Sequence, residues 1–317
     1  MTGRDLYPPI EPFDVRKVAV DNPHTLHVEQ SGKPDGVPVV FLHGGPGAIW
    51  SAHNRRFFDP GHYRLIAFDQ RGTWRSTPVG ELKDNTTPHL IQDIEHLREL
   101  FAIERWIVFG GSWGSALGLA YAEHHPERCL GVVLRGISLG LGVEGGWSFH
   151  QSRWIRPEAW EALVASIPPA ERGDLDAAIE RRIMDPDPAI HRPVVKGWMD
   201  QAEILGKSRH ADLDLHEDAV ADDAADLVCA RISIHYFRNH LFLPPGSLLG
   251  DAHKLKAIPG VIVHGMDDFN TPLANAYDLH RAWPEASYRP IPDAGHSCFD
   301  RNNRLALVEA MEEMKGV

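Results

Sequence analysis

Cysteine is scarce in this chain, and long apolar runs are missing from it. Its 317 residues include only 3 cysteines, and Cys129, Cys229 and Cys298 lie far apart. An odd and widely spaced set of cysteines predicts neither a disulfide framework nor a zinc cluster. No apolar run reaches the length that a membrane span needs, so we expect no membrane association.

Basic residues are also fewer than acidic ones. The chain has 32 Lys and Arg against 44 Asp and Glu, which gives a formal net charge of -12. Because nucleic acid is bound through a basic face, we expect no nucleic-acid partner. The first residues carry acids and prolines and have neither the basic nor the apolar part of a signal peptide. We therefore expect a soluble cytoplasmic protein, whose oligomeric state the sequence does not indicate.

Short apolar runs rich in β-branched residues are what the chain does contain. They lie at residues 37–42, 64–69, 105–110, 130–135 and 259–265. Unbroken hydrophobicity is typical of strands that are buried on both faces, as in a parallel sheet covered by helices. Between the runs lie helical patterns, such as residues 87–101, with Thr86 or Thr87 as the N-cap. This alternation predicts an α/β fold with a mostly parallel central sheet.

The strand pattern is interrupted in the second half of the chain. It stops near residue 137 and resumes at residue 259, and the interval holds helical segments and proline-rich breaks. We predict a helical lid over residues 137–245. The lid would divide the core into a first part, residues 1–136, and a second part, residues 246–317.

A candidate nucleophile lies between a predicted strand and a helix rich in small residues. Gly110, Ser112 and Gly114 form a G-x-S-x-G pattern. A serine at such a turn is held in a strained conformation, and side chains on both sides would collide with the strand and the helix. A phosphate-binding loop is excluded because no G-x-x-x-x-G-K-[ST] pattern is present.

A serine nucleophile needs a histidine base and an acid that orients the histidine. Of the 19 histidines, His296 follows the last predicted strand directly after a glycine, whereas His264 is better explained as packing behind the acid loop. Asp267 and Asp268 follow the preceding strand, and their positions alone do not decide between them. The order Ser, Asp, His is that of the α/β-hydrolase fold.

An oxyanion hole needs backbone N–H groups close to the reacting carbonyl oxygen. The glycine-rich segment HGGPG at residues 43–47 follows an early strand. We expect Gly44 and Gly45 to supply one part of the hole. Trp113, which follows the nucleophile, is expected to supply the other part.

Together these motifs resemble those of the proline iminopeptidase family, which are serine aminopeptidases of the α/β-hydrolase fold. The resemblance rests on HGGPG at 43–47, FDQRG at 68–72, GGSWGS at 110–115, LRGI at 134–137 and DAGHS at 293–297. It implies that Ser112, Asp268 and His296 form a catalytic triad. It also implies that the helical insertion encloses the substrate.

The family binds the free imino group of an N-terminal proline through acidic residues of the lid. This chain departs from that pattern, since Ser233 stands where the second acid is expected. The remaining carboxylates that could bind the substrate are, in order, Glu203, Asp200 and Glu144. Arg135 and His150 are further candidates for substrate binding.

We therefore predict a serine hydrolase that releases an N-terminal proline or a similar small residue from short peptides or amino-acid amides. The reaction proceeds through an acyl-enzyme and needs no metal or organic cofactor. One alternative is an amidase or esterase that acts on substrates without a free α-amine. Another is a ligand-binding member of the fold that has no catalytic activity.

Overall fold

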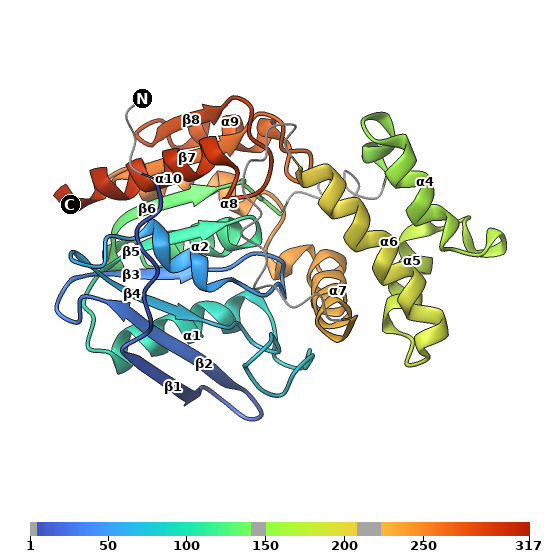
Figure 1. Ribbon diagram of the computed structural model, residues 1–317, viewed down its shortest axis with the longest axis horizontal. Coiled ribbons are helices and arrows are strands. Elements are labelled where there is room, and N and C mark those ends of the chain that lie inside the picture. The colour runs from blue at the N-terminus through green and yellow to red at the C-terminus, as the bar shows by residue number, and fades with distance from the viewer. Residues whose placement is uncertain (1–4, 141–149, 208–222) are drawn as a thin grey trace.

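An eight-stranded sheet forms the centre of the structure, a computed structural model that describes residues 5–140, 150–207 and 223–317 (Figure 1). The strand order is β1-β2-β4-β3-β5-β6-β7-β8. The strands β1 and β2 pair antiparallel with their neighbours, and the other six run parallel to one another. The strands are β1 (Asp14–Ala19), β2 (Thr25–Gly32), β3 (Val37–Leu42), β4 (Tyr63–Phe68), β5 (Trp106–Gly111), β6 (Cys129–Arg135), β7 (Gly260–Gly265) and β8 (Ser287–Ile291).

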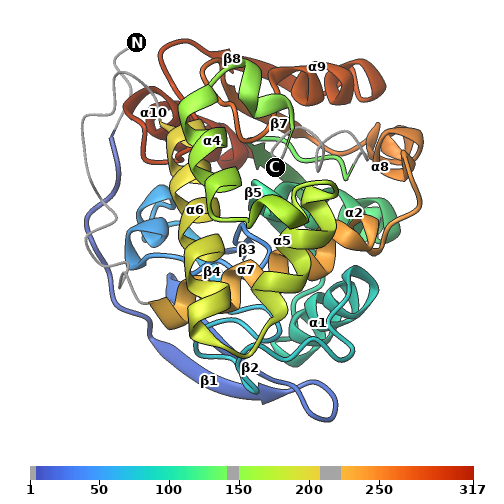
Figure 2. The same ribbon diagram turned by 90° about the vertical axis from the view of Figure 1, so that its right-hand side faces the viewer.

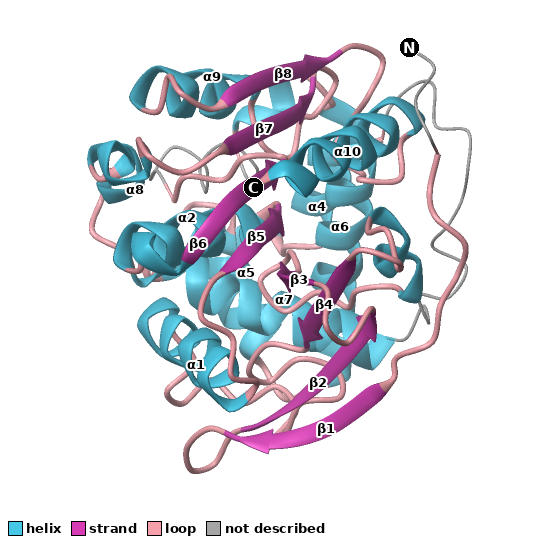
Figure 3. Ribbon diagram, turned by 90° about the vertical axis from the view of Figure 1, so that its left-hand side faces the viewer, coloured by secondary structure: helices cyan, strands magenta, loops and turns pink. Residues whose placement is uncertain are grey.

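Helices cover both faces of this sheet, as Figure 3 shows from the side opposite the outer helices. The helices α1 (Thr87–Leu100), α2 (Trp113–His124) and α9 (Leu273–Ala282) pack on one face together with the short helix α8 (Ser247–Gly250). The helix α10 (Arg301–Glu313) and the 3-10 helix η1 (Ala52–Phe57) pack on the other face. The predicted α/β fold with a mostly parallel sheet is thereby confirmed.

The central strands match the apolar runs of the sequence because their side chains are buried on both faces. Every residue of β5 and β7 is buried. The two antiparallel strands, β1 and β2, are different, and the pattern of apolar residues does not reveal them. In β2 the buried side chains include His27, Glu29 and Gln30, which form hydrogen bonds, and β1 is largely exposed.

Four helices lie beyond the carboxyl ends of the parallel strands, and we call them the outer helices (Figure 2). They are α4 (Pro157–Ala165), α5 (Leu175–Met184), α6 (Pro188–Gly206) and α7 (Asp223–Arg238). Their apolar side chains form a hydrophobic cluster of their own. The exact limits of a lid domain, at residues 137 and 245, stay a prediction.

The remaining elements are short. They are the 3-10 helices η2 (Pro126–Arg128), η3 (Gln151–Trp154), η4 (Pro169–Glu171), η5 (His240–Phe242), η6 (Ala252–Leu255) and η7 (Met314–Gly316). Among the helices of the described ranges, none has both the length and the apolar character that crossing a membrane would require.

Candidate active site

Ser112 lies at the tight turn between β5 and α2, and its backbone has φ 58° and ψ −127°. A non-glycine residue with positive φ is strained, which is typical of a functional turn. A Cβ atom added to Gly110 would lie 2.1 Å from the Gly114 carbonyl oxygen, and one added to Gly114 would lie 2.0 Å from the Leu42 carbonyl oxygen. Both flanking glycines are therefore required by close backbone contacts.

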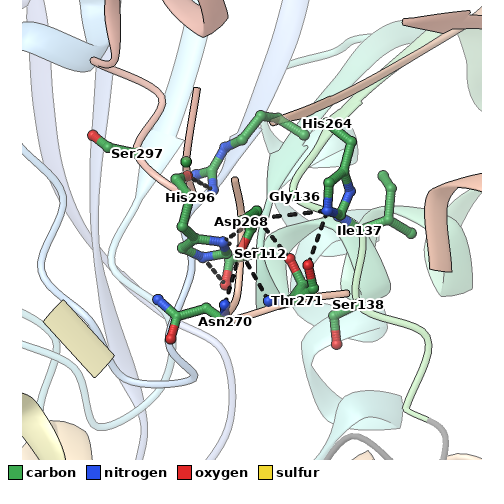
Figure 4. Close-up of polar contacts among 12 residues, drawn as sticks. Ser112, Gly136, Ile137, Ser138, His264, Asp268, Asn270, Thr271, His296 and Ser297 are labelled. Atoms are coloured by element: carbon green, nitrogen blue, oxygen red, sulfur yellow. Dashed lines mark hydrogen bonds and ion pairs between the residues drawn. The ribbon is translucent and has the colours of Figure 1, made fainter. Parts of the chain in front are cut away.

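His296 and Asp268 meet Ser112 at the carboxyl edge of the sheet (Figure 4). His296 Nε2 lies 2.9 Å from Ser112 Oγ, and His296 Nδ1 lies 2.7 Å from Asp268 Oδ2. The serine follows β5, the aspartate follows β7 and the histidine follows β8. The three side chains thus form a continuous chain of hydrogen bonds.

Asp268 is fully enclosed, but its carboxylate has several hydrogen-bond donors. Its Oδ1 accepts hydrogen bonds from the backbone N–H groups of Asn270 and Thr271, both at 2.9 Å, and its Oδ2 accepts one from Thr271 Oγ1 at 2.9 Å. Burial alone would raise the pKa of Asp268, but His296 and these donors lower it to about 2. Asp268 is therefore ionised at neutral pH.

The adjacent carboxylate is placed differently. Asp267 is half-buried, and its backbone N–H donates to the Ala294 carbonyl oxygen at 2.8 Å. His264 lies behind the acid loop, where its Nδ1 accepts a hydrogen bond from Ile137 N–H at 3.1 Å. The proton of His264 is therefore on Nε2, which donates to the Thr271 carbonyl oxygen at 2.9 Å. Burial lowers the pKa of His264 and keeps this ring neutral.

The glycine-rich loop after β3 approaches Ser112 closely. A Cβ atom added to Gly44 would lie 3.2 Å from Ser112 Cβ. Gly44, Gly45 and Trp113 line one cavity together with Ser112. Trp113 begins α2, and the first N–H groups of a helix have no partner within that helix. The N-terminal end of α2 also carries a partial positive charge.

Two residues that the sequence analysis did not single out, His43 and Gln70, connect the glycine-rich loop to the start of α2 through hydrogen bonds. The backbone N–H of Gln70 donates to His43 Nε2 at 3.0 Å, so the proton of His43 is on Nδ1, which donates to the Gly44 carbonyl oxygen at 3.0 Å. The Gln70 side chain donates to the His43 carbonyl oxygen at 3.0 Å and accepts from Trp113 Nε1 at 2.8 Å. Gln70 lies two residues after β4 within the FDQRG motif, which is the signal that could have revealed it.

A cavity of about 350 Å³ opens above Ser112, between the sheet edge and the outer helices. On its far side it is lined by Trp198, Gln201, Leu205, Ser233 and Phe237, all from α6 and α7. Gln201 is buried, and its Nε2 donates to Ser152 Oγ at 2.9 Å. No Asp or Glu side chain of the described residues lines this cavity.

The predicted substrate-binding carboxylates do not lie where the sequence analysis expected them. Glu203 forms an ion pair with Lys207, and Asp200 forms one with Lys196 at 2.7 Å, both on the exposed side of α6. The physical reason is the helical period, which turns residues 198, 201 and 205 toward the cavity and residues 200 and 203 away from it.

The other three candidates have different positions. His150 is exposed and lies 2.9 Å from Asp176, so it too is outside the cavity. Glu144 lies outside the described residues. Arg135 does line the cavity. The prediction of substrate binding therefore needs correction for Glu203, Asp200 and His150.

The fold and the arrangement of Ser112, His296 and Asp268 define an α/β hydrolase. A family model described as alpha/beta hydrolase fold matches residues 37–302. The chain is 45% identical over 314 residues to a proline iminopeptidase of Xylella fastidiosa, which covers 98% of this chain and 99% of that protein. It is 46% identical to a proline iminopeptidase of Xanthomonas citri, over 98% and 99% of the two chains.

The chain therefore belongs to the proline iminopeptidase family of α/β hydrolases. Its relation to these proteins confirms the predicted enzyme class, a hydrolase of the peptidase type. A solved epoxide hydrolase from metagenomes of hot environments superposes with a TM-score of 0.64 at 22% identity and covers 96% of this chain and 99% of that chain. That likeness concerns the fold alone.

Proposed function

We propose that the protein releases an N-terminal proline, or a similar small residue, from short peptides or amino-acid amides. The observation that carries this proposal is the hydrogen-bonded chain of Ser112, His296 and Asp268 at the floor of a cavity of about 350 Å³. Sequence similarity to proline iminopeptidases supports the choice of substrate.

In the acylation step, Ser112 Oγ attacks the carbonyl carbon of the N-terminal residue while His296 Nε2 takes the serine proton. His296 then gives this proton to the leaving amine as the C–N bond breaks. Water, activated by the same histidine, hydrolyses the ester and releases the N-terminal residue. Asp268 remains ionised throughout, holds the Nδ1 proton and stabilises the imidazolium that forms.

The negative charge that develops on the carbonyl oxygen requires donors that are already in place. Trp113 N–H, at the start of α2, is one donor, and the N-terminal end of that helix favours the charge. The second donor comes from the loop of Gly44 and Gly45. His43 holds the Gly44 carbonyl oxygen, and across a trans peptide the Gly45 N–H points the opposite way.

The cavity favours a small, partly apolar residue at the cleavage site. Trp198, Leu205 and Phe237 supply apolar surface for a pyrrolidine ring. Gln201 is a neutral polar group beside them, and its Nε2 is already bonded to Ser152. Its amide oxygen is therefore the atom that accepts a hydrogen bond from the substrate amine.

Hydrolysis of prolyl anilide, N-acetylprolyl anilide and a simple aryl ester tests the proposal. We expect the free prolyl anilide to have the highest kcat/KM and the Ser112→Ala variant to be inactive on all three. A higher kcat/KM for the acetylated substrate or the ester would instead indicate an amidase or esterase. Failure of a fluorophosphonate to label folded protein at Ser112 would indicate a binding protein without catalysis.

A further inference from the structure

Arg135 ends strand β6 and lies directly beside the turn that carries the nucleophile. A Cβ atom added to Gly111 would lie 2.6 Å from Arg135 Nη2 and 2.9 Å from Arg135 Cζ. The guanidinium therefore packs against the bare backbone of Gly111, one residue before Ser112. A side chain at position 111 would displace the guanidinium from this place.

Within residues 5–140, 150–207 and 223–317, no carboxylate is in contact with the guanidinium of Arg135. Its Nη1 donates to the backbone carbonyl oxygen of His296 at 2.6 Å, and its Nε is buried without a hydrogen-bond partner. Among the described residues, no ion pair within 4.0 Å involves Arg135. Arg135 favours the ionised form of Asp300 from beyond contact distance, and Asp300 accepts a hydrogen bond from Gly295 N–H.

Other buried arginines of this chain are paired. Arg71 binds Asp93 with two hydrogen bonds of 2.7 Å, and Arg55 binds Glu29 at 2.5 Å. A partly buried cation without a counter-ion in direct contact costs free energy, and an anionic ligand would lower that cost. The exception at Arg135 therefore indicates where a negative group of the substrate binds.

The position of Arg135 indicates which negative group of the substrate it binds. Arg135 lines the cavity of about 350 Å³ above Ser112 and also a second cavity of about 150 Å³ on the η1 and α10 face of the sheet. The two cavities share Gly44 and Arg135, so the guanidinium stands at their boundary. The proposed site of the N-terminal residue lies at Trp198, Leu205 and Phe237 of the larger cavity. The boundary between the two cavities, where Arg135 lies, is therefore left for the leaving group.

We propose that Arg135 binds the free α-carboxylate of the residue that follows the scissile bond, so that dipeptides are the preferred substrates. This inference rests on the proposed function. Guanidinium and carboxylate form short, charge-assisted hydrogen bonds, which are stronger than neutral ones. The smaller cavity is lined by Phe41, Trp50, Phe109 and Phe299, and it accepts an apolar side chain of the leaving residue.

The test compares prolyl-alanine with prolyl-alaninamide, which differ in the carboxylate charge. We expect the native enzyme to have a kcat/KM at least about 10-fold higher for the free dipeptide. In Arg135→Gln this ratio falls to about 1, while Arg192→Gln, a change of an exposed arginine on α6, keeps the native ratio. Taking the ratio removes any effect of the substitution that is common to both substrates.

A native ratio near 1, or an Arg135→Gln ratio equal to the native one, would overturn the inference. If Arg135→Gln does not fold, product inhibition of the native enzyme decides, because alanine should inhibit at least about 10-fold more strongly than alaninamide. Equal inhibition by the two would contradict the proposal. Prolyl anilide distinguishes the two proposals. If the enzyme cleaves it but does not prefer prolyl-alanine over prolyl-alaninamide, only this inference is contradicted. Cleavage of no prolyl substrate defeats the proposed function.

Discussion

At the scale of single residues, two neighbouring aspartates have different surroundings although they share one loop. Asp268 is buried and receives hydrogen bonds from Thr271 and His296, whereas Asp267 is half-buried. Adjacent residues of a loop point in different directions, so only one of them can orient the imidazole. The orientation of the backbone after β7 therefore decides which aspartate acts.

Replacing Asp268 by Asn should lower kcat by about three to four orders of magnitude. The amide would favour the wrong tautomer of His296 and could not stabilise the imidazolium. Asp267→Asn is the matched control and should change kcat by less than about threefold. Steady-state kinetics on prolyl anilide measures both, and equal losses in the two variants would contradict the assignment of Asp268.

Gln70 is the second residue whose effect should be visible in catalysis, although we expect it to act only through its neighbours. Gln70→Leu removes the two side-chain hydrogen bonds, one donated to the His43 carbonyl oxygen and one accepted from Trp113 Nε1, which position both parts of the proposed oxyanion hole. We expect kcat to fall by about 10- to 100-fold with little change in KM, since transition-state stabilisation is what is lost. Gln92→Leu, on the exposed side of α1, should leave kcat unchanged. A folded Gln70→Leu variant with native kcat would contradict this role.

A site residue can be predicted from the sequence when the residues that mark it are its own neighbours in the chain. Ser112 and His296 are recognisable because the glycines around them belong to the same turns. The choice of Asp268 needed the family resemblance, because two acids stand side by side. Glu203 and Asp200 were predicted because they lie near the position at which the family has a lid carboxylate, whereas the helical period of α6 decides that Gln201 faces the cavity.

At the scale of secondary-structure elements, the hydrophobic pattern predicts strands whose side chains are buried among apolar neighbours. It misses strands that bury charged side chains in ion pairs. The strands β3 to β7 were predicted within a residue or two because they are uniformly apolar. The strand β2 was not, because it buries the Glu29 carboxylate against Arg55. The N-cap of α1 is Thr86, one of the two predicted positions, although its side chain makes no capping hydrogen bond.

The helix α2 contains a buried carboxyl group that can be tested by pH. Glu123 is 4% exposed, and burial, with a smaller effect of Asp251, raises its pKa to about 9. Near neutral pH the folded protein therefore keeps Glu123 protonated, whereas the unfolded chain ionises it. The unfolded state binds fewer protons, so stability falls as pH rises from about 4.5 toward 9.

Glu123→Gln mimics the protonated form and should remove this fall of stability with rising pH. The variant should become more stable than the native protein by up to about 1.4 kcal/mol for each pH unit in that range. Urea unfolding at about pH 5.5, 7.0 and 8.5 measures the difference, and Glu127→Gln, at an exposed site on η2, should show no such trend. A difference independent of pH would show that Glu123 is ionised in the folded protein.

At the scale of the whole molecule, the sheet and the outer helices have separate hydrophobic clusters. Two clusters cover the two faces of the sheet, and a third joins α4, α5 and α6. The helix α7 connects them, since Ile234 belongs to the outer cluster and Tyr236 to a cluster of the sheet. Elements that share few apolar contacts with the core open at a lower free energy than the core does.

Ile179→Ala should therefore loosen the outer helices without unfolding the sheet. Ile179 is 1% exposed within the outer cluster, and removing its side chain should cost about 2–5 kcal/mol locally. We expect faster hydrogen exchange in α4, α5 and α6, unchanged exchange in the central strands, and a raised KM because α6 lines the cavity. Ile107→Ala, in the sheet, should speed exchange in both regions, since global unfolding then exposes them together. Equal acceleration in both regions by Ile179→Ala would show that the outer helices and the sheet unfold as one unit.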